Sequence, residues 1–399
     1  MNRSRHILPI IVFSQFCCTS LWFAGNGVMA DLVTSFNLRD SALGHLTSAV
    51  QFGFIFGTFL FAVLCITDRF SPSKVFFISA ILGGLFNLSI VFEGNTIKSL
   101  LLFRFFTGFF LAGIYPVGMK IASDYYEKGL GKSLGFLVGA LVIGTAFPHL
   151  LKGFGGFILW KWIVYITTVL AFLGGLFILL FVPNGPFRKI VTKLDLSITY
   201  KVFKKPSFRS AAFGYFGHMW ELYAFWAFTP VLLASYTFYH PGTHFNIPVL
   251  SFIIIATGGL ACVGSGYLSE SFGTKKMAII SLGLSCFCCL ASPLFFLQQS
   301  EILFIGFLIF WGMVVIADSP LFSTLIAQKV EAEYKGTALT IVNSIGFAIT
   351  IVSIQLLSSL KNHMDSKYLF LILAVGPIFG LIALYDKKRL ANYFSINHH

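Results

Sequence analysis

The sequence predicts an all-α polytopic membrane protein with twelve transmembrane helices in two pseudo-symmetric six-helix bundles. Of the 399 residues, 57% are hydrophobic and only 11% are charged, whereas a soluble domain carries roughly 25% charged residues. The 48 Phe residues suit a lipid-facing surface better than a single water-soluble core. Low charge content, apolar stretches of membrane-spanning length and an internal duplication therefore favour the same fold class.

Twelve apolar stretches are long enough to cross a bilayer, which takes about 20 residues per helix. Charged or turn-forming residues separate each stretch from the next. The expected spans are residues 7–30, 41–66, 75–93, 99–122, 133–155, 160–182, 209–236, 248–268, 277–297, 302–327, 337–360 and 368–386.

The basic residues are distributed unevenly across the expected membrane. When both termini are placed in the cytoplasm, 20 of the 28 Lys and Arg residues fall in cytoplasmic segments and 6 in outer segments, while Arg104 and Lys120 lie within a span. Basic loops resist translocation, so this bias orients the chain. We therefore expect a multi-pass protein of the bacterial inner (plasma) membrane with both termini cytoplasmic. The net charge of +13 then reflects topology and indicates no nucleic-acid partner.

The chain divides into two similar halves. Residues 183–208 form a polar, basic stretch with prolines at both ends, and we interpret it as a cytoplasmic linker between bundles at 1–182 and 209–399. "LCITDRFSPSK" (64–74) aligns with "GYLSESFGTKK" (266–276) at an offset of 202 residues, and Pro116 aligns with Pro320 at an offset of 204. A nearly constant offset over such distances indicates a duplicated six-helix unit.

These two loops also resemble a known pattern. "GYLSESFGTKK" resembles the Gly-x-Leu-x-acidic-x-x-Gly-x-basic-basic loop of the major facilitator superfamily, and "ITDRFSPSK" is similar to its copy in the first half. "RFFTGFFLAGIYPVG" (104–118) resembles the fourth-helix pattern of that superfamily. The resemblance implies a secondary transporter working by alternating access, with loop residues that latch its cytoplasmic side. The latch candidates are Asp68, Arg69, Lys74, Glu270, Gly273, Lys275 and Lys276.

Few polar residues lie inside the expected spans. Each charged one costs about 2.5–3.5 kcal/mol to insert at the bilayer centre, so such residues usually face a polar cavity. The resemblance implies that the first, fourth, seventh and tenth spans line that cavity, and most of the set lies on them. The set is Asn26, Asp31, Arg104, Lys120, His149, His218, Glu221, Asp318, Asn343 and Gln355.

The stretch "GHMWELYAFW" (217–226) holds the candidates for proton coupling. His218 and Glu221 are three residues apart and project from one helical face, with Glu221 near the middle of its span. Burial favours the neutral form of a carboxylic acid, and a nearby imidazole can exchange protons with it. The alternative is a structural pair that ties the helix to a neighbour. Asp318, before Pro320, is either a second proton site or a gating residue.

The substrate candidates are Arg104, Asn26, Tyr115, Trp226 and Asn343. The guanidinium of Arg104 can hold a carboxylate or phosphate through two hydrogen bonds. An equally weighted alternative is an interhelical tie from Arg104 to a backbone carbonyl or to Asp31. Lys120 and Asp124 have i, i+4 spacing, which favours an intrahelical salt bridge at the inner gate.

Taken together, these features predict a transporter and no enzyme. "GFGG" (153–156) lacks the Lys of a nucleotide-binding loop, and the seven Cys residues lack metal-binding spacing. We expect a monomer in the lipid bilayer without cofactor or metal, in which the proton gradient drives import of a small polar or anionic organic metabolite. The span 133–155 lacks the glycine pattern of drug exporters, which favours uptake. Proton-driven efflux of an amphipathic compound is the alternative within transport, and a channel or membrane-embedded enzyme the alternative outside it.

Overall fold

The computed structural model describes residues 6–39, 41–126, 130–154, 159–188, 198–331 and 335–385, and all regular elements in these ranges are helices. The first half contains α1 (Ile7–Thr19), α2 (Ala24–Gly27), α3 (Met29–Ser35), α4 (Ala42–Val63), α5 (Ile66–Arg69), α6 (Pro72–Leu88), η2 (Ser89–Val91), α7 (Ile97–Leu111), α8 (Tyr115–Tyr125), α9 (Leu130–Gly153) and α10 (Trp160–Phe181). The rest contains α11 (Ile198–Lys204), α12 (Pro206–Tyr239), α13 (Ile247–Phe272), α14 (Thr274–Phe296), α15 (Glu301–Ala317), α16 (Ser319–Gln328), α17 (Lys335–Leu360), α18 (Ser366–Leu369), η4 (Phe370–Ala374) and α19 (Val375–Leu384).

The helices agree with the twelve expected spans. Within the described ranges, ten helical segments are long and apolar enough to cross a membrane. The two further spans are the first, in which a short α1 of 13 residues is followed by α2 and α3, and the seventh, in which α12 has 34 residues. The prediction of an all-α, twelve-span fold is confirmed.

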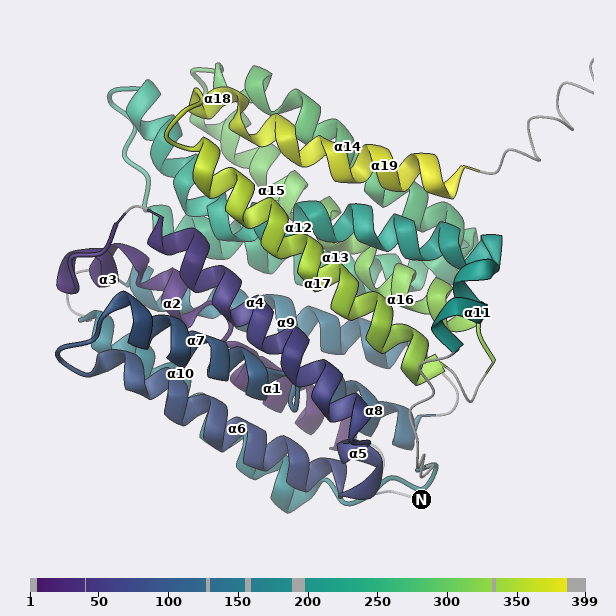
Figure 1. Cartoon of the computed structure of the whole chain (residues 1–399). Coiled ribbons are helices and arrows are strands. Elements are labelled where there is room, and N and C mark those ends of the chain that lie inside the picture. The colour runs from purple at the N-terminus through teal and green to yellow at the C-terminus, as the bar shows by residue number, and fades with distance from the viewer. Residues whose placement is uncertain are drawn as a thin grey trace, which may run out of the picture.

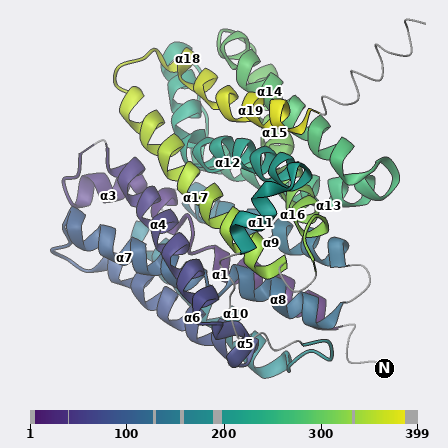
Figure 2. The same ribbon diagram turned by 45° about the vertical axis from the view of Figure 1, so that its right-hand side comes forward.

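The two halves lie side by side, as Figures 1 and 2 show by the separation of purple and blue helices from green and yellow ones. The contacts between them run along α4 against α17 and α9 against α13. Gly139 of α9 and Gly259 of α13 permit a close crossing, because a Cβ on either residue would lie 3.1 Å from the other's carbonyl oxygen. Residues 189–197 of the expected linker lie outside the described residues, and the boundaries at 182 and 209 remain predictions.

Three spans are interrupted near their middle. The first breaks at residues 20–23, the fourth between α7 and α8, and the tenth at Asp318 between α15 and α16. Pro116 and Pro320 are the second residues of α8 and α16, where the ring removes a backbone donor that would otherwise continue the preceding helix. The duplicated prolines therefore mark equivalent breaks in the two halves, and the backbone groups freed at such breaks often form binding sites in transporters.

The two loops expected to form the latch differ in detail. Gly273 has φ +87°, a conformation that favours glycine, and it separates α13 from α14. Glu270, Lys275 and Lys276 are exposed around it. In the first half, Arg69 and Lys74 are exposed, and the side chain of Asp68 lies outside the described part of the structure. The proposed latch pairing stays a prediction.

Close packing of α4 on α7 gives the first testable result. A Cβ on Gly108 would lie 2.0 Å from the Val50 carbonyl oxygen, so Gly108→Ala should force the two helices apart. We expect a loss of about 1–3 kcal/mol in stability, read as a lower unfolding temperature of the detergent-purified protein. Gly283→Ala is the control, because a Cβ there meets nothing within 4 Å. Equal unfolding temperatures for the two variants would contradict the close helix contact.

Candidate functional site

Glu221 is held in a cage of three donors inside the second half. Its Oε1 accepts hydrogen bonds from Ser285 Oγ at 2.6 Å, Trp311 Nε1 at 2.6 Å and Cys289 Sγ at 3.2 Å. Glu221 is only 1% exposed. Among the described residues no hydrogen-bond donor contacts its Oε2, so the three donors hold only one of the two carboxylate oxygens.

His218 does not pair with Glu221, contrary to the alternative considered from the sequence. Its Nδ1 lies 2.8 Å from Oδ1 of Asp318, at the break between α15 and α16, and both side chains are 1% exposed. In the described structure, His218 Nε2 and Asp318 Oδ2 have no hydrogen-bond partner. The pair therefore joins the imidazole of α12 to a buried carboxyl group 100 positions away in sequence.

The orientation of α12 corrects a second expectation. Tyr223 and Trp226 face the first half, where Tyr223 lies 5.7 Å from Trp22 and Trp226 lies 6.3 Å from Phe23 between ring centroids. Glu221 faces α14 and α15 instead. Residues 221 and 223 lie on roughly opposite sides of a helix with about 3.6 residues per turn. The expectation that Glu221 faces the cavity between the halves is wrong.

An aromatic layer closes the interface between the halves. We use this name for Trp22, Phe54, Tyr223, Trp226 and Phe347, all of which are buried. The Trp22 ring lies 4.8 Å from Phe54 and 5.7 Å from Phe347, and Phe54 lies 4.5 Å from Phe347. Tyr223 lies 5.2 Å from both Trp226 and Phe347. Side chains from α12 and α17 of the second half thus stack on side chains of the first.

Arg104 supports the break in the first span. Its guanidinium donates hydrogen bonds to the carbonyl oxygen of Leu21, at 3.1 Å, and to that of Trp22. These carbonyls lie where the break leaves them without helical partners. Asp31 is not the partner of Arg104, because both of its oxygens accept from Lys152 Nζ, at 2.8 and 2.7 Å. The interhelical tie to backbone carbonyls is therefore present in this conformation.

Several polar groups at this interface lack partners within the described structure. They are Trp22 Nε1, Trp226 Nε1, Arg104 Nε, both amide atoms of Gln51, and Ser344 Oγ. Gln51 lies one helical turn from Phe54, and Ser344 one turn from Phe347, so both adjoin the aromatic layer. An unsatisfied buried polar group costs about 1–3 kcal/mol. Such a concentration is typical of a site that a ligand completes.

The remaining candidates surround this interface at different depths. Asn26 Nδ2 donates to Thr47 Oγ1 at 2.8 Å. Tyr115 is half-buried at the start of α8. Asn343 is half-buried on α17 beside Ser344. The expected Lys120–Asp124 salt bridge is present, with Lys120 Nζ 3.6 Å from Asp124 Oδ1.

Two hydrogen bonds join the halves at the end of the bundle that the predicted orientation places outside. Gln355 Nε2 donates to Ser48 Oγ at 2.8 Å, and Asn246 Nδ2 donates to the Gly153 carbonyl at 3.2 Å. Both bonds lie toward the outer ends of α4, α9 and α17 given the predicted orientation. Together with the buried aromatic layer, they hold the two halves in contact at this end of the bundle.

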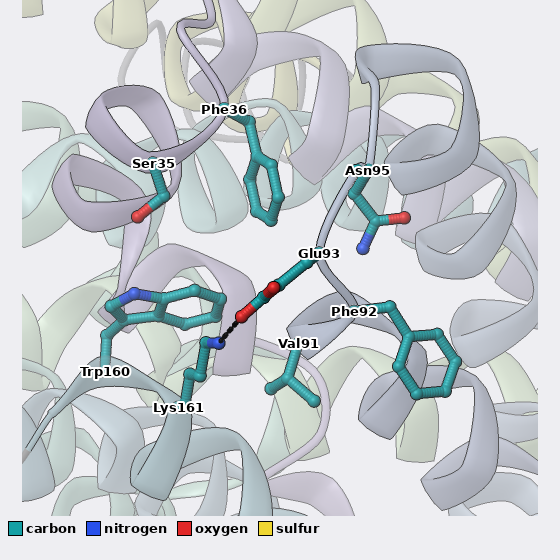
Figure 3. A pocket seen from close by; sticks show the side chains of 9 residues that line it. Ser35, Phe36, Val91, Phe92, Glu93, Asn95, Trp160 and Lys161 are labelled. Atoms are coloured by element: carbon teal, nitrogen blue, oxygen red, sulfur yellow. Dashed lines mark hydrogen bonds and ion pairs between the residues drawn. The ribbon is translucent and has the colours of Figure 1, made fainter.

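Two surface pockets include no residue of the aromatic layer and none of His218, Glu221 and Asp318. One of about 400 Å³ is formed by the ends of α3, η2 and α10, and Figure 3 shows Trp160, Phe36 and the Glu93–Lys161 ion pair around it. Another, of about 200 Å³, includes Glu270. The 400 Å³ pocket contains none of the predicted site residues, and the exposed Glu93–Lys161 pair at 3.4 Å is weak. We therefore place the candidate site at the interface between the halves and at the neighbouring residues His218, Glu221 and Asp318.

We define the acid cluster as His218, Glu221 and Asp318. Helix α12 contributes residues both to this cluster and to the aromatic layer, but the two groups have different surroundings. The sequence pointed to the acid cluster, Arg104 and Trp226, but it did not single out Trp22, Gln51 or Ser285 as site residues. Gln51 had a usable signal, because an amide inside an apolar span is itself unusual. No group of three or more His, Cys, Asp or Glu residues within the described ranges could hold a metal ion.

An all-helical bundle with interrupted spans and buried polar sites is the architecture of a polytopic membrane transporter rather than an enzyme. Residues 11–354 match the Major Facilitator Superfamily. The chain belongs to this family.

The similar curated proteins are both uncharacterized transporters of Schizosaccharomyces pombe. One is 20% identical over 288 residues, covering 64% of this chain and 56% of the relative. The other is 26% identical over 179 residues, covering 44% of this chain and 30% of the relative. The matched part of the chain thus spans about half, or less, of the length of these relatives.

Solved structures share the fold at low sequence identity. A D-xylose–proton symporter superposes with a TM-score of 0.76 at 14% identity, covering 95% of this chain and 97% of that one. The nucleoside transporter NupG gives 0.72 at 16% identity, covering 96% and 100%. A bacterial homolog of the human lysosomal transporter Spinster, in an inward-facing form, gives 0.68 at 15% identity, covering 96% of both chains. These likenesses establish the fold alone.

Proposed function

We propose that this protein is a proton-coupled secondary transporter that imports a small polar or anionic organic solute by alternating access. The solute binds at the aromatic layer between the halves, and rocking of the halves exposes it to either side. The protein acts as a monomer in the bacterial inner membrane with both termini cytoplasmic. It uses the proton gradient and no cofactor.

The observation that carries the proposal is the pairing of two buried sites on α12. Tyr223 and Trp226 contribute to the interface between the halves, while His218 and Glu221 belong to the acid cluster behind it. Asp318 of that cluster lies at the break in the tenth span. A change in its protonation would alter the charge at this break, and would thereby couple proton binding to the movement of α16.

Two structures that share the fold are of proton:xylose symporters, which agrees in kind with this proposal. The identities of 13% and 14% provide no guide to the substrate. Support for proton coupling therefore rests on the buried carboxyl groups of this chain, which are costly in a membrane helix unless they have a role.

The test uses the purified full-length protein in proteoliposomes with a pH-sensitive dye in the lumen. A panel of sugars, nucleosides, carboxylates, amines and lipophilic drugs is added outside. An imported solute should acidify the lumen in step with its uptake, and an inside-alkaline gradient should drive its accumulation. Solute movement without any proton flux would contradict the coupling. Proton flux opposite in direction to the solute would favour the alternative, proton-driven efflux.

A further inference from the structure

We infer that the solute bound between the halves is a ring-bearing organic anion, whose charged group is held by Arg104 and the indole N–H groups of Trp22 and Trp226. This inference rests on the proposed transport function and specifies the substrate class of the same site.

The free polar groups at the interface determine what a ligand must supply. Trp22 Nε1, Trp226 Nε1 and Arg104 Nε have no partner in the part of the chain that the structure describes, and all three can only donate hydrogen bonds. Trp22 is 1% exposed, Trp226 0% and Arg104 1%. Three buried donors without acceptors call for a ligand rich in acceptor atoms.

The charge of Arg104 makes that ligand an anion. Two of its nitrogens donate to the carbonyls of Leu21 and Trp22, which are dipoles and leave its positive charge uncompensated. Asp31 is engaged by Lys152, and Glu221 and Asp318 point into the second half. No carboxylate among the described residues pairs with Arg104. Buried charges are normally paired, so an anionic solute would provide the missing counter-charge.

The aromatic layer is the reason to expect an aromatic ring in the solute. Trp22 and Tyr223 are stacked with an interplanar angle of 29° and a centroid distance of 5.7 Å, and Trp22 and Phe347 with 26° and 5.7 Å. These nearly parallel faces come from opposite halves, so they separate when the halves move. A planar ring that enters between them replaces aromatic contacts that are lost on opening.

A purely structural layer would not explain the free donors. A layer that served only to seal the interface would be as stable with Phe in place of Trp22 and Trp226, since phenylalanine leaves no indole N–H unpaired. Gly25 packs directly against Arg104, because a Cβ there would lie only 3.3 Å from Arg104 Nε, so the lack of a side chain on Gly25 makes room for the guanidinium itself.

The first experiment measures ligand-induced thermal stabilisation of the purified full-length protein in detergent. The probes are benzoate, 4-hydroxybenzoate and nicotinate, their neutral amides, and acetate as an anion without a ring. We expect at least one ring-bearing anion to stabilise the protein at a concentration about tenfold lower than its amide or acetate requires. If each amide matches its acid, or acetate matches benzoate, the inference is overturned.

The second experiment separates the indole N–H groups from the rings. Trp22→Phe and Trp226→Phe keep an aromatic side chain and remove one donor each, so each should weaken binding of the anion by about tenfold or more. Trp162→Phe is the matched control, because Trp162 is 56% exposed on the outside of α10. Unchanged anion affinity in both interface variants would contradict the assigned contacts.

Failure of this inference is distinguishable from failure of the proposed function. If a neutral or cationic solute moves protons in proteoliposomes and no ring-bearing anion binds, the substrate class is wrong and proton-coupled transport stands. If a ring-bearing anion binds selectively and is transported without proton flux, the substrate class stands and the coupling is wrong.

Discussion

Replacing Glu221 with Gln should abolish proton-driven accumulation of the solute while leaving the fold intact. The amide oxygen of Gln can accept the hydrogen bonds of Ser285 Oγ and Trp311 Nε1 that Glu221 Oε1 now accepts. The cage should therefore form as before. The amide cannot take up and release a proton in the physiological range, so a solute gradient could no longer be built from a pH gradient.

Two transport assays on the same proteoliposomes check this result. Under an imposed pH gradient, the Glu221→Gln variant should accumulate no more solute than liposomes without protein. In exchange mode, with solute on both sides and no gradient, it should still equilibrate label faster than those liposomes. Ser285→Ala is the control, because it removes one donor to Glu221 and keeps the carboxyl group, and it should retain accumulation.

The acid cluster contains a second carboxyl group, so Asp318→Asn is assayed in parallel. If Asp318→Asn alone loses accumulation, the proton-binding residue is Asp318, which contacts His218, and not Glu221. If both variants accumulate solute normally and with normal pH dependence, the acid cluster has only a structural role. The proposal of proton coupling would then lose its support.

The sequence predicted the membrane architecture well, because hydropathy and charge act locally along the chain. Span length and the distribution of Lys and Arg identified the helices. The offset of 204 residues between Pro116 and Pro320 indicated a duplicated unit, and the structure shows that helix breaks adjoin both prolines. The Lys120–Asp124 salt bridge was also predictable, since both residues lie on one helix at i, i+4 spacing.

Pairings between helices could not be predicted in the same way. Helical periodicity puts His218 and Glu221 on one face of α12, but it does not show which neighbours that face meets. In the structure, α15 and α14 bring Asp318 to His218 and Ser285 to Glu221. Which face of α12 meets the first half depends on the packing of the second half as a whole, and a single sequence carries no signal for that packing.

The free indole N–H groups of the aromatic layer could not be predicted from the sequence for a related reason. A Trp in an apolar span is usually a packing or interfacial residue, and only its surroundings reveal whether its N–H has an acceptor. Trp311 donates to Glu221 at 2.6 Å, whereas Trp22 and Trp226 lack acceptors within the described residues. Three residues of one type thus have different roles that only tertiary structure separates.

The second large effect is expected from Arg104. Arg104→Ala should destabilise the protein severely, because it removes both donors from the Leu21 and Trp22 carbonyls. At about 1–3 kcal/mol for each buried carbonyl left without a partner, the two together would cost about 2–6 kcal/mol. The void left by a fully buried arginine adds to this loss. Thermal unfolding and the monodisperse fraction on size exclusion measure the effect.

Arg104→Lys and Arg104→Gln then separate support of the helix break from recognition of the solute. Lys keeps the charge but lacks the planar guanidinium, whereas Gln keeps donors for a carbonyl and loses the charge. If Arg104 acts in both ways, both variants should be more stable than Arg104→Ala, and Gln should lose more affinity for a ring-bearing anion than Lys. An Arg104→Ala variant as stable as the native protein would show that the first span is held by its packing alone. Equal anion affinity in the Lys and Gln variants would confine Arg104 to supporting the break, because a residue that recognises an anion cannot lose its positive charge without effect.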